Sequence, residues 1–205
     1  LEDLFDLQDE MTQSISSTIE PELEQLEVRR ALGKQPTNLT AWDYVMRARS
    51  VVRSLEVENL RKACELAQHA LELQPGYGDA LSVLAMSHAV GASMGLSDSP
   101  IRDAEEALRF ASEALKDNGR NNWALCARGI AQSMQGMLDP AVDSLRLSIS
   151  NNPNNSFSRR ILARILCYRG DYEEALREAE LALKLAPRDM LLSYYRIHPG
   201  FVPFR

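Results

Sequence analysis

The chain has 205 residues, 45% of them apolar but only 6% aromatic, with a formal net charge of −6 and a pI of about 5.2. This length suits one elongated domain, and the apolar residues are largely Ala and Leu, which favour closely packed helices. The acidic balance argues against nucleic acid and anionic membranes as partners, because both attract basic surfaces. Direct membrane insertion is not predicted either, since no run of about 18 uncharged apolar residues occurs.

Residues 1–36 differ from the rest of the chain. Apolar residues recur at intervals of three or four, which predicts an amphipathic helix that Pro21 kinks or restarts and that Gly33 and Pro36 end. Such a stripe must be buried, either on the first unit that follows or on an upstream domain. We interpret the segment as a remnant of that domain or a linker from it. The stripe consists of Leu4, Leu7, Met11, Ile15, Ile19, Leu23 and Leu26.

Residues 37–189 show an internal period of 34 residues. Small residues at this spacing let two helices pack at short distance, so each period predicts one helical hairpin. Four hairpins are expected, at about 41–77, 78–121, 122–155 and 156–189. The residues that repeat are Ala107, Ala141 and Ala175; Gly129 and Ala163; Gly136 and Gly170; Ala114, Ser148 and Ala182; and Gly119, Pro153 and Pro187.

The first two hairpins differ from the last two in the length of the connection between their helices. The first has a connecting turn of about three residues between its helices. In the second, about ten residues have been added, centred on the Gly-, Ser- and Pro-rich stretch 91–100. This composition predicts a mobile loop, after which Ser99 and Pro100 restart the helix.

The last two hairpins follow the frame closely. In the third, Asp139 is expected to cap the second helix, with Pro140 at its first position. In the fourth, Leu162, Ala163 and Leu166 form the buried stripe of the first helix. There Asp171 and Glu174 predict a capping box at the start of the second helix, where two side chains satisfy two free backbone donors.

Residues 190–205 begin like another first helix, but Pro199, Gly200 and Pro203 stop it. A solenoid needs a cap on its last apolar face. We therefore expect this segment to be a capping helix and tail. Leu191, Leu192 and Tyr195 would cover the fourth hairpin, and Phe201 and Phe204 would lie in the tail.

The period, the small residues on both helices and the closing proline resemble tetratricopeptide repeats (TPR) over about residues 40–189. The large aromatic of the family's first helix is replaced by Leu81, Leu125 and Arg159. The resemblance implies an all-α, right-handed superhelical solenoid of about four hairpins, preceded by the N-terminal helical segment. It also implies a protein or peptide partner.

A second resemblance concerns the stretches 4–12, 39–43 and 96–100. They look like a bacterial arrangement in which a TolB-like domain is followed by tetratricopeptide repeats, downstream of class III adenylate or guanylate cyclase domains or behind winged-helix regulators. The resemblance implies a signalling parent. It carries over no cyclase metal ligand or nucleotide motif, because no such residues are present in this sequence.

No catalytic, cofactor or metal site is predicted within the chain. No phosphate-binding or hydrolase motif occurs, and His69, His88 and His198 have no ligand partner at a suitable spacing. The three cysteines share no metal-ligand spacing, so buried free thiols in a reducing compartment are expected. A disulfide or a metal site is the alternative.

The candidate binding site is the concave face. In stacked hairpins the first helices line this face, and residues off their packing stripe point into the groove. Aromatic and Arg side chains there suit a peptide partner, whereas a solvated helix face with intramolecular packing is the alternative. The family's peptide clamp of Lys and Asn is not reproduced. The predicted groove residues are Trp42, Arg49, Arg53, Met86, Trp123, Ile130, Phe157, Arg160, Arg164 and Tyr168, beside Asp79, Ser82, Ala89, Cys126, Ser133 and Cys167.

These features together predict a non-catalytic interaction or regulatory module of a bacterial signalling protein, with a nucleotidyl cyclase (a lyase) as the favoured parent. An assembly scaffold of a transcription regulator and a small-molecule sensor are the alternatives. The partner is a protein or peptide segment of another chain or of the same one, and a homodimer through the exposed ends stays open. A cytoplasmic location is expected, with the periplasmic part of a membrane-anchored parent as the alternative.

Overall fold

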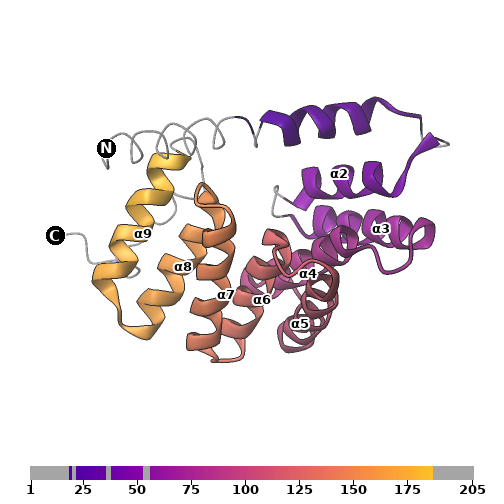
Figure 1. The fold of residues 1–205 in the computed structure, drawn as a ribbon. Coiled ribbons are helices and arrows are strands. Elements are labelled where there is room, and N and C mark those ends of the chain that lie inside the picture. The colour runs from indigo at the N-terminus through magenta and orange to yellow at the C-terminus, as the bar shows by residue number, and fades with distance from the viewer. Residues whose placement is uncertain (1–18, 20–21, 36–37, 53–55, 187–205) are drawn as a thin grey trace.

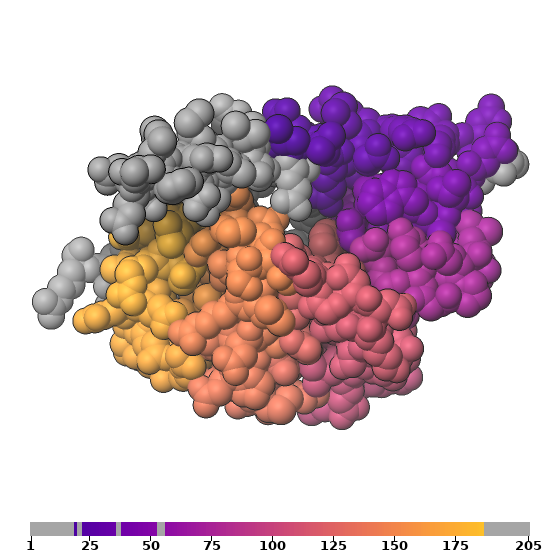
Figure 2. All heavy atoms as spheres, viewed as in Figure 1, coloured from indigo at the N-terminus to yellow at the C-terminus, as the bar shows by residue number. Residues whose placement is uncertain are grey.

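The computed structural model describes residues 19, 22–35, 38–52 and 56–186, and every regular element within these ranges is a helix (Figure 1). Consecutive helices form hairpins, and each hairpin packs on the next, so the units follow one another as bands of one continuous body (Figure 2). The predicted all-α solenoid is confirmed. Its helices are α2 (Ala41–Val52), α3 (Val57–Leu73), α4 (Gly78–Ser93), α5 (Pro100–Asp117), α6 (Asn122–Met134), α7 (Leu138–Asn151), α8 (Ser156–Arg169) and α9 (Tyr172–Leu185).

The turns between hairpins repeat almost without change. After α3, α5 and α7, the backbone N–H three residues beyond the cap residue donates to the carbonyl of that cap residue. This closes the same tight turn each time and directs the chain into the next first helix. The three bonds join Tyr77 to Gln74 (3.2 Å), Asn121 to Asn118 (3.0 Å) and Asn155 to Asn152 (3.1 Å).

The ten additional residues of the second hairpin are shared among three places. Helix α4 has 16 residues against 13 in α6, and α5 has 18 against 14 in α7. The connection is Met94–Ser99, compared with Gln135–Met137 in the third hairpin. The prediction that 91–100 is a loop was therefore wrong for 91–93, where Gly91 and Ala92 are buried in the last turn of α4. Ser99 and Pro100 do begin α5, as expected.

The shortened loop gives a testable expectation. Met94 and Gly95 are exposed, and the connection has no apolar periodicity, so limited proteolysis should cut within 94–99 before it cuts the compact turn 152–155. Mass spectrometry of the first fragments would identify the bond. First cleavage at 152–155 would contradict the expectation, as would resistance of 94–99 under conditions that cut elsewhere.

Two of the predicted helix caps do not form a capping hydrogen bond. Asp171 does precede α9, but its side chain makes no cap hydrogen bond; its carboxylate accepts from Arg169 instead, so the capping box is absent. Helix α7 begins at Leu138, which puts Asp139 inside the first turn, where its Oδ1 accepts from Arg169 Nη1 at 2.9 Å. A competing arginine thus draws both carboxylates away from the backbone.

Asn155, by contrast, caps the first helix of the fourth hairpin with its side chain. It is the residue before α8, and its side chain accepts a hydrogen bond from the Ser158 N–H at 3.0 Å. Asn121 does the same for α6 with the Ala124 N–H at 3.1 Å. Such caps satisfy backbone donors that the helix leaves free at its start.

The described part of the N-terminal segment is helical over 22–33 and packs beside α2 (Figure 1). Ala31 is buried against the core and Val28 is packed on it, while Arg47 donates to the carbonyls of Ala31 (2.7 Å) and Lys34 (2.7 Å) at the end of this helix. The expected burial of the stripe was wrong for its described members. Ile19, Leu23 and Leu26 are 48%, 55% and 57% exposed, because the helix packs through a different face.

All three cysteines are free thiols, as predicted, and burial raises the pKa of each of them. Within the described ranges, no cluster of His, Cys, Asp or Glu is arranged to bind a metal ion. Nor does any helix in those ranges have the length and apolar character needed to cross a bilayer. The predicted capping helix and tail, 190–205, and residues 1–18 lie outside the described residues.

Candidate binding site on the first helices

The predicted groove residues come from the four first helices, α2, α4, α6 and α8. Arg53 lies outside the described residues. Most of the others belong to two clusters, and Met86, Ile130, Trp42 and Tyr168 lie apart from these. Helix α4 packs extensively on α6, whereas α6 and α8 make few contacts. The first helices therefore pack less closely on each other between α6 and α8 than between α4 and α6.

The first cluster joins three successive hairpins. Arg49 of α2 pairs with Asp79 of α4 (Nη2 to Oδ1, 2.9 Å), and its guanidinium lies over the Trp123 ring of α6 at 5.1 Å from the centroid. Asn121 completes the cluster by donating from Nδ2 to the same Asp79 oxygen at 3.1 Å. Arg49 thus makes both the ion pair and the stacking contact that Arg commonly uses at binding surfaces.

This first cluster is partly shielded from water. The side chain of Arg49 is only 13% exposed, and its Nε is buried without a hydrogen-bond partner. Burial raises the pKa of Tyr77 to about 12, and the nearby Asp79 carboxylate adds to the effect because it disfavours a second negative charge. The cluster therefore keeps one hydrogen-bond donor unused beside two aromatic rings.

The second cluster lies between α6 and α8. The guanidinium of Arg160 stacks on the Phe157 ring at 4.7 Å, and Arg164 follows one turn later on α8. Both arginines are close to Cys126 of α6: burial raises the pKa of this thiol to about 12, and the two positive charges only partly oppose that effect. Arg160 is itself 7% exposed, so this cluster is largely shielded from water.

The remaining predicted residues behave differently from one another. Met86 and Ile130 are 4% and 0% exposed, so they form the floor of the face and do not offer surface to a partner; for these two side chains the prediction needs correction. Trp42 is 39% exposed, and its Nε1 donates to Glu27 of the 22–33 helix at 3.1 Å. Tyr168, at the end of α8, is 54% exposed.

Asp79 was predicted from the sequence to be a groove residue, but Asn121 was not. Nothing in the pattern links these two residues, which are 42 positions apart. The signal that was available is local: Asn121 precedes α6, where an N-cap is expected, and the turn at the end of α5 brings it beside α4.

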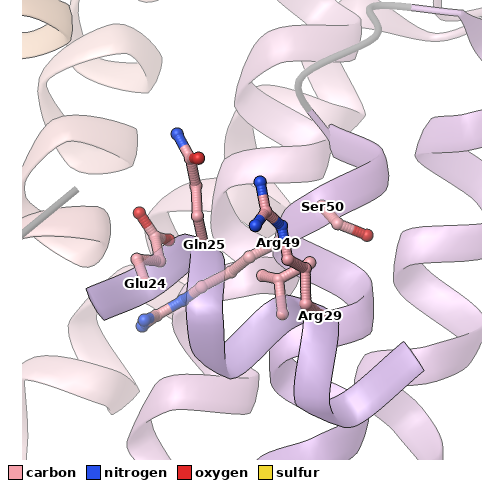
Figure 3. A pocket seen from close by; sticks show the side chains of 6 residues that line it. Glu24, Gln25, Arg29, Arg49 and Ser50 are labelled. Carbon is pink, nitrogen blue, oxygen red and sulfur yellow. The ribbon is translucent and has the colours of Figure 1, made fainter. Parts of the chain in front are cut away.

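A shallow pocket separates the 22–33 helix from α2. It has a volume of about 230 Å³, and polar side chains from both helices surround it in Figure 3. Binding pockets for small molecules usually measure roughly 300–1,000 Å³, so this pocket is small for that role. The lining residues are Glu24, Gln25, Val28, Arg29, Arg49 and Ser50.

Solved structures with the same arrangement of hairpins are known. One is TTC0263, a thermophilic TPR protein of Thermus thermophilus, with a TM-score of 0.65 and 21% identity over 90% of this chain and 97% of that one. The fold is that of a tetratricopeptide-repeat solenoid. Cut9 with Hcn1, described as an APC/C hetero-tetramer, gives a TM-score of 0.57 and 17% identity over 76% of this chain and 29% of that one. YrrB, described as a TPR protein with an unusual peptide-binding site, gives 0.50 and 20% over 91% and 89%.

No family model matches the chain. Among curated proteins, one named "Putative adenylate cyclase 3" from Rhizobium meliloti (strain 1021) is 26% identical over 144 residues, which cover 69% of this chain and 24% of that protein. The TPR chain therefore spans about a quarter of the length of this relative.

Proposed function

We propose that this TPR solenoid is a non-catalytic interaction module whose concave face binds a segment of a protein. The observation that carries the proposal is the Arg49 cluster, because it brings Arg, Trp and Asn side chains from three hairpins into one place. Trp and Arg are the residue types that dominate binding energy at protein interfaces. The peptide-binding site named for YrrB supports the same use of the fold.

The parent that fits best is a bacterial signalling protein with a nucleotidyl cyclase domain. The 26% identity to the Rhizobium relative supports it, as do the sequence stretches that resemble the TolB-like arrangement. In this proposal the solenoid regulates the cyclase by binding a partner segment from another protein or from the parent itself. We place it in the cytoplasm, which suits its three free thiols.

An assembly scaffold of a transcription regulator is the second candidate, and the domain upstream decides between the two. A small-molecule sensor is less well supported, because the pocket beside α2 is shallow and, at about 230 Å³, smaller than most small-molecule sites.

A photo-crosslinking experiment tests the binding face. The parent protein would carry p-benzoylphenylalanine at Tyr168, which is exposed at the end of the first helix α8, and in a matched version at Ile101, which is 78% exposed on the second helix α5. We expect crosslinks from Tyr168 to one defined segment of a protein and none to that segment from Ile101. Equal crosslinking from both positions would overturn the assignment of the concave face.

The signalling role needs a separate measurement on the full parent. Cyclic nucleotide formation by wild-type parent should change when Trp123 is replaced by Ala, whereas an Ile101→Ala parent should behave as wild type, because Ile101 lies on a second helix. A parent without cyclase activity would instead favour the scaffold. Unchanged activity in the Trp123→Ala protein would remove the proposed coupling.

A further inference from the structure

The helix over 22–33 presents apolar side chains to the surface. Leu26 lies on the side of this helix opposite to Val28 and Ala31, because successive residues of an α-helix are turned by about 100°. Val28 and Ala31 are the residues that pack on the core. Leu23 lies beside Leu26 on the outward side, and the two side chains are 55% and 57% exposed. Neighbouring apolar side chains exposed on one face mark a site of protein–protein contact.

Charged side chains of opposite sign flank these leucines. Glu22 lies one turn before Leu26 and Arg30 one turn after it, so the two charges are placed symmetrically about this leucine on the same outward face. Both charged residues are exposed. Arg30 contacts Glu27 at 3.6 Å, with side chains 69% and 38% exposed. A surface ion pair of this kind contributes little, so it leaves Arg30 able to pair with another carboxylate.

This outward face is complementary to itself. If two copies of the helix cross antiparallel about a two-fold axis at Leu26, the two leucines meet at the axis, and Glu22 of each copy faces Arg30 of the other. Ile19, which is 48% exposed, then faces Gly33 of the other copy. A Cβ atom at Gly33 would meet no described residue beyond its own helix within 4 Å, so a larger side chain has room there. A parallel pair would instead set like charges face to face, which is unfavourable.

We propose that the outward face of the 22–33 helix binds a second copy of this chain, as an antiparallel pair of helices related by a two-fold axis at Leu26. Two helices of this length bury less than the roughly 1,000 Å² of a stable interface, so the association is weak and depends on concentration. The pairing joins two solenoids at their N-terminal ends. It does not depend on what the concave face binds, and the two surfaces can be tested separately.

Sedimentation equilibrium of the full chain measures this association. The average mass should rise from that of the 23.0 kDa chain towards twice that value as the concentration is increased to about 0.5 mM. Leu26→Glu should abolish the rise, because it places two carboxylates at the axis in place of an apolar contact. The matched control is Ile101→Glu, which changes an apolar residue that is 78% exposed on α5 and should leave the rise unchanged.

Charge exchange tests the antiparallel register. Glu22→Arg and Arg30→Glu should each weaken the association at least about fivefold, because each substitution puts like charges face to face. A mixture of the two variant proteins should associate at least as tightly as wild type, since every charge at the contact then faces one of opposite sign. In a parallel pair, each single variant would associate no more weakly than wild type, and that result would overturn the proposed arrangement.

Two other results would also overturn the proposal. A chain that keeps the mass of a monomer at about 0.5 mM does not use this face for a second copy. Equal loss of association in Ile101→Glu would show that the contact is non-specific. Thermal melts verify that each variant folds, which is expected because the substituted side chains are exposed. If crosslinks form from Tyr168 while the chain stays monomeric, the concave binding face stands and self-association is overturned.

Discussion

A Gly129→Leu protein should be less stable than wild type by about 3 kcal/mol or more, because Gly129 lies where α6 crosses α7. A Cβ atom at Gly129 would lie 2.8 Å from Leu145 Cγ and 3.2 Å from the Ala141 carbonyl oxygen. Leu145 is fully buried, so it cannot move aside without disturbing its own packing. Even Gly129→Ala should destabilise the fold, although alanine is the better helix former.

Gly91 provides the matched control, since it lies inside the first helix α4. A Cβ there would meet only Leu60 Cδ1, at an ordinary contact distance of 3.7 Å. Gly91→Ala should therefore stabilise the chain by about 0.5–1 kcal/mol, through the smaller loss of backbone entropy on folding. Urea titrations of the three proteins would measure the differences. If Gly129→Ala and Gly91→Ala both raise or both lower the free energy of unfolding, the close approach of α6 and α7 at Gly129 does not exclude a side chain there.

Ala163 is the residue of the next hairpin at the position of Gly129, and it is 6% exposed. Ala163→Leu should cost about 1–3 kcal/mol by overpacking the α8–α9 contact. If the melting temperatures of Gly129→Leu and Ala163→Leu both equal that of the wild type, the predicted 34-residue period is wrong.

The second large expected effect is a loss of folding stability at low pH, where the Asp43 carboxylate becomes protonated. The Asp43 carboxylate accepts hydrogen bonds from Lys34 Nζ (2.6 Å), the Thr40 N–H (2.8 Å) and the Thr40 hydroxyl (2.6 Å). Burial by itself would raise the pKa of Asp43, but the hydrogen bonds from Lys34 and Thr40 outweigh it and lower the pKa from 3.8 to about 2. The folded state therefore favours the charged carboxylate.

The direction of the pH effect follows from this lowered pKa. The stabilisation is fully present above pH 4, where the unfolded carboxylate is also charged, and is lost as the pH falls from about 4 towards 2. Its size is about 2 kcal/mol, because one pKa unit corresponds to about 1.4 kcal/mol. Asp43→Asn should lower the free energy of unfolding at pH 7 by a similar amount and flatten its pH dependence below pH 4.

Urea unfolding at pH 7, 5 and 3 measures this expectation, with Asp98→Asn as the control. Asp98 is exposed in the connection between α4 and α5, so its replacement should change little at any of these pH values. If Asp43→Asn retains the acid sensitivity of the wild type, the ion pair with Lys34 does not account for it.

The repeat register could be predicted from the sequence because it depends on residue size at fixed positions. Ala107, Ala141 and Ala175 are each 0% exposed, and only small side chains fit where two helices of a hairpin meet. Local turn composition predicted Ser99 at the start of its helix, and the spacing of the cysteines predicted three free thiols. Each of these features is set by residues close in sequence or by one repeated contact.

Other features depended on contacts that no local pattern contains. The capping box at Asp171 failed because Arg169 takes its carboxylate, and the apolar stripe of 19–26 faces outward because Val28 and Ala31 already pack the helix on the core. The sequence alone determined the hairpins, their period and the arginine and aromatic residues available on the first helices. Only the tertiary structure decided that Arg49 meets Asp79 and Trp123, and that Arg164 stays without an ion pair among the described residues, because these outcomes depend on how far each hairpin rotates against the next.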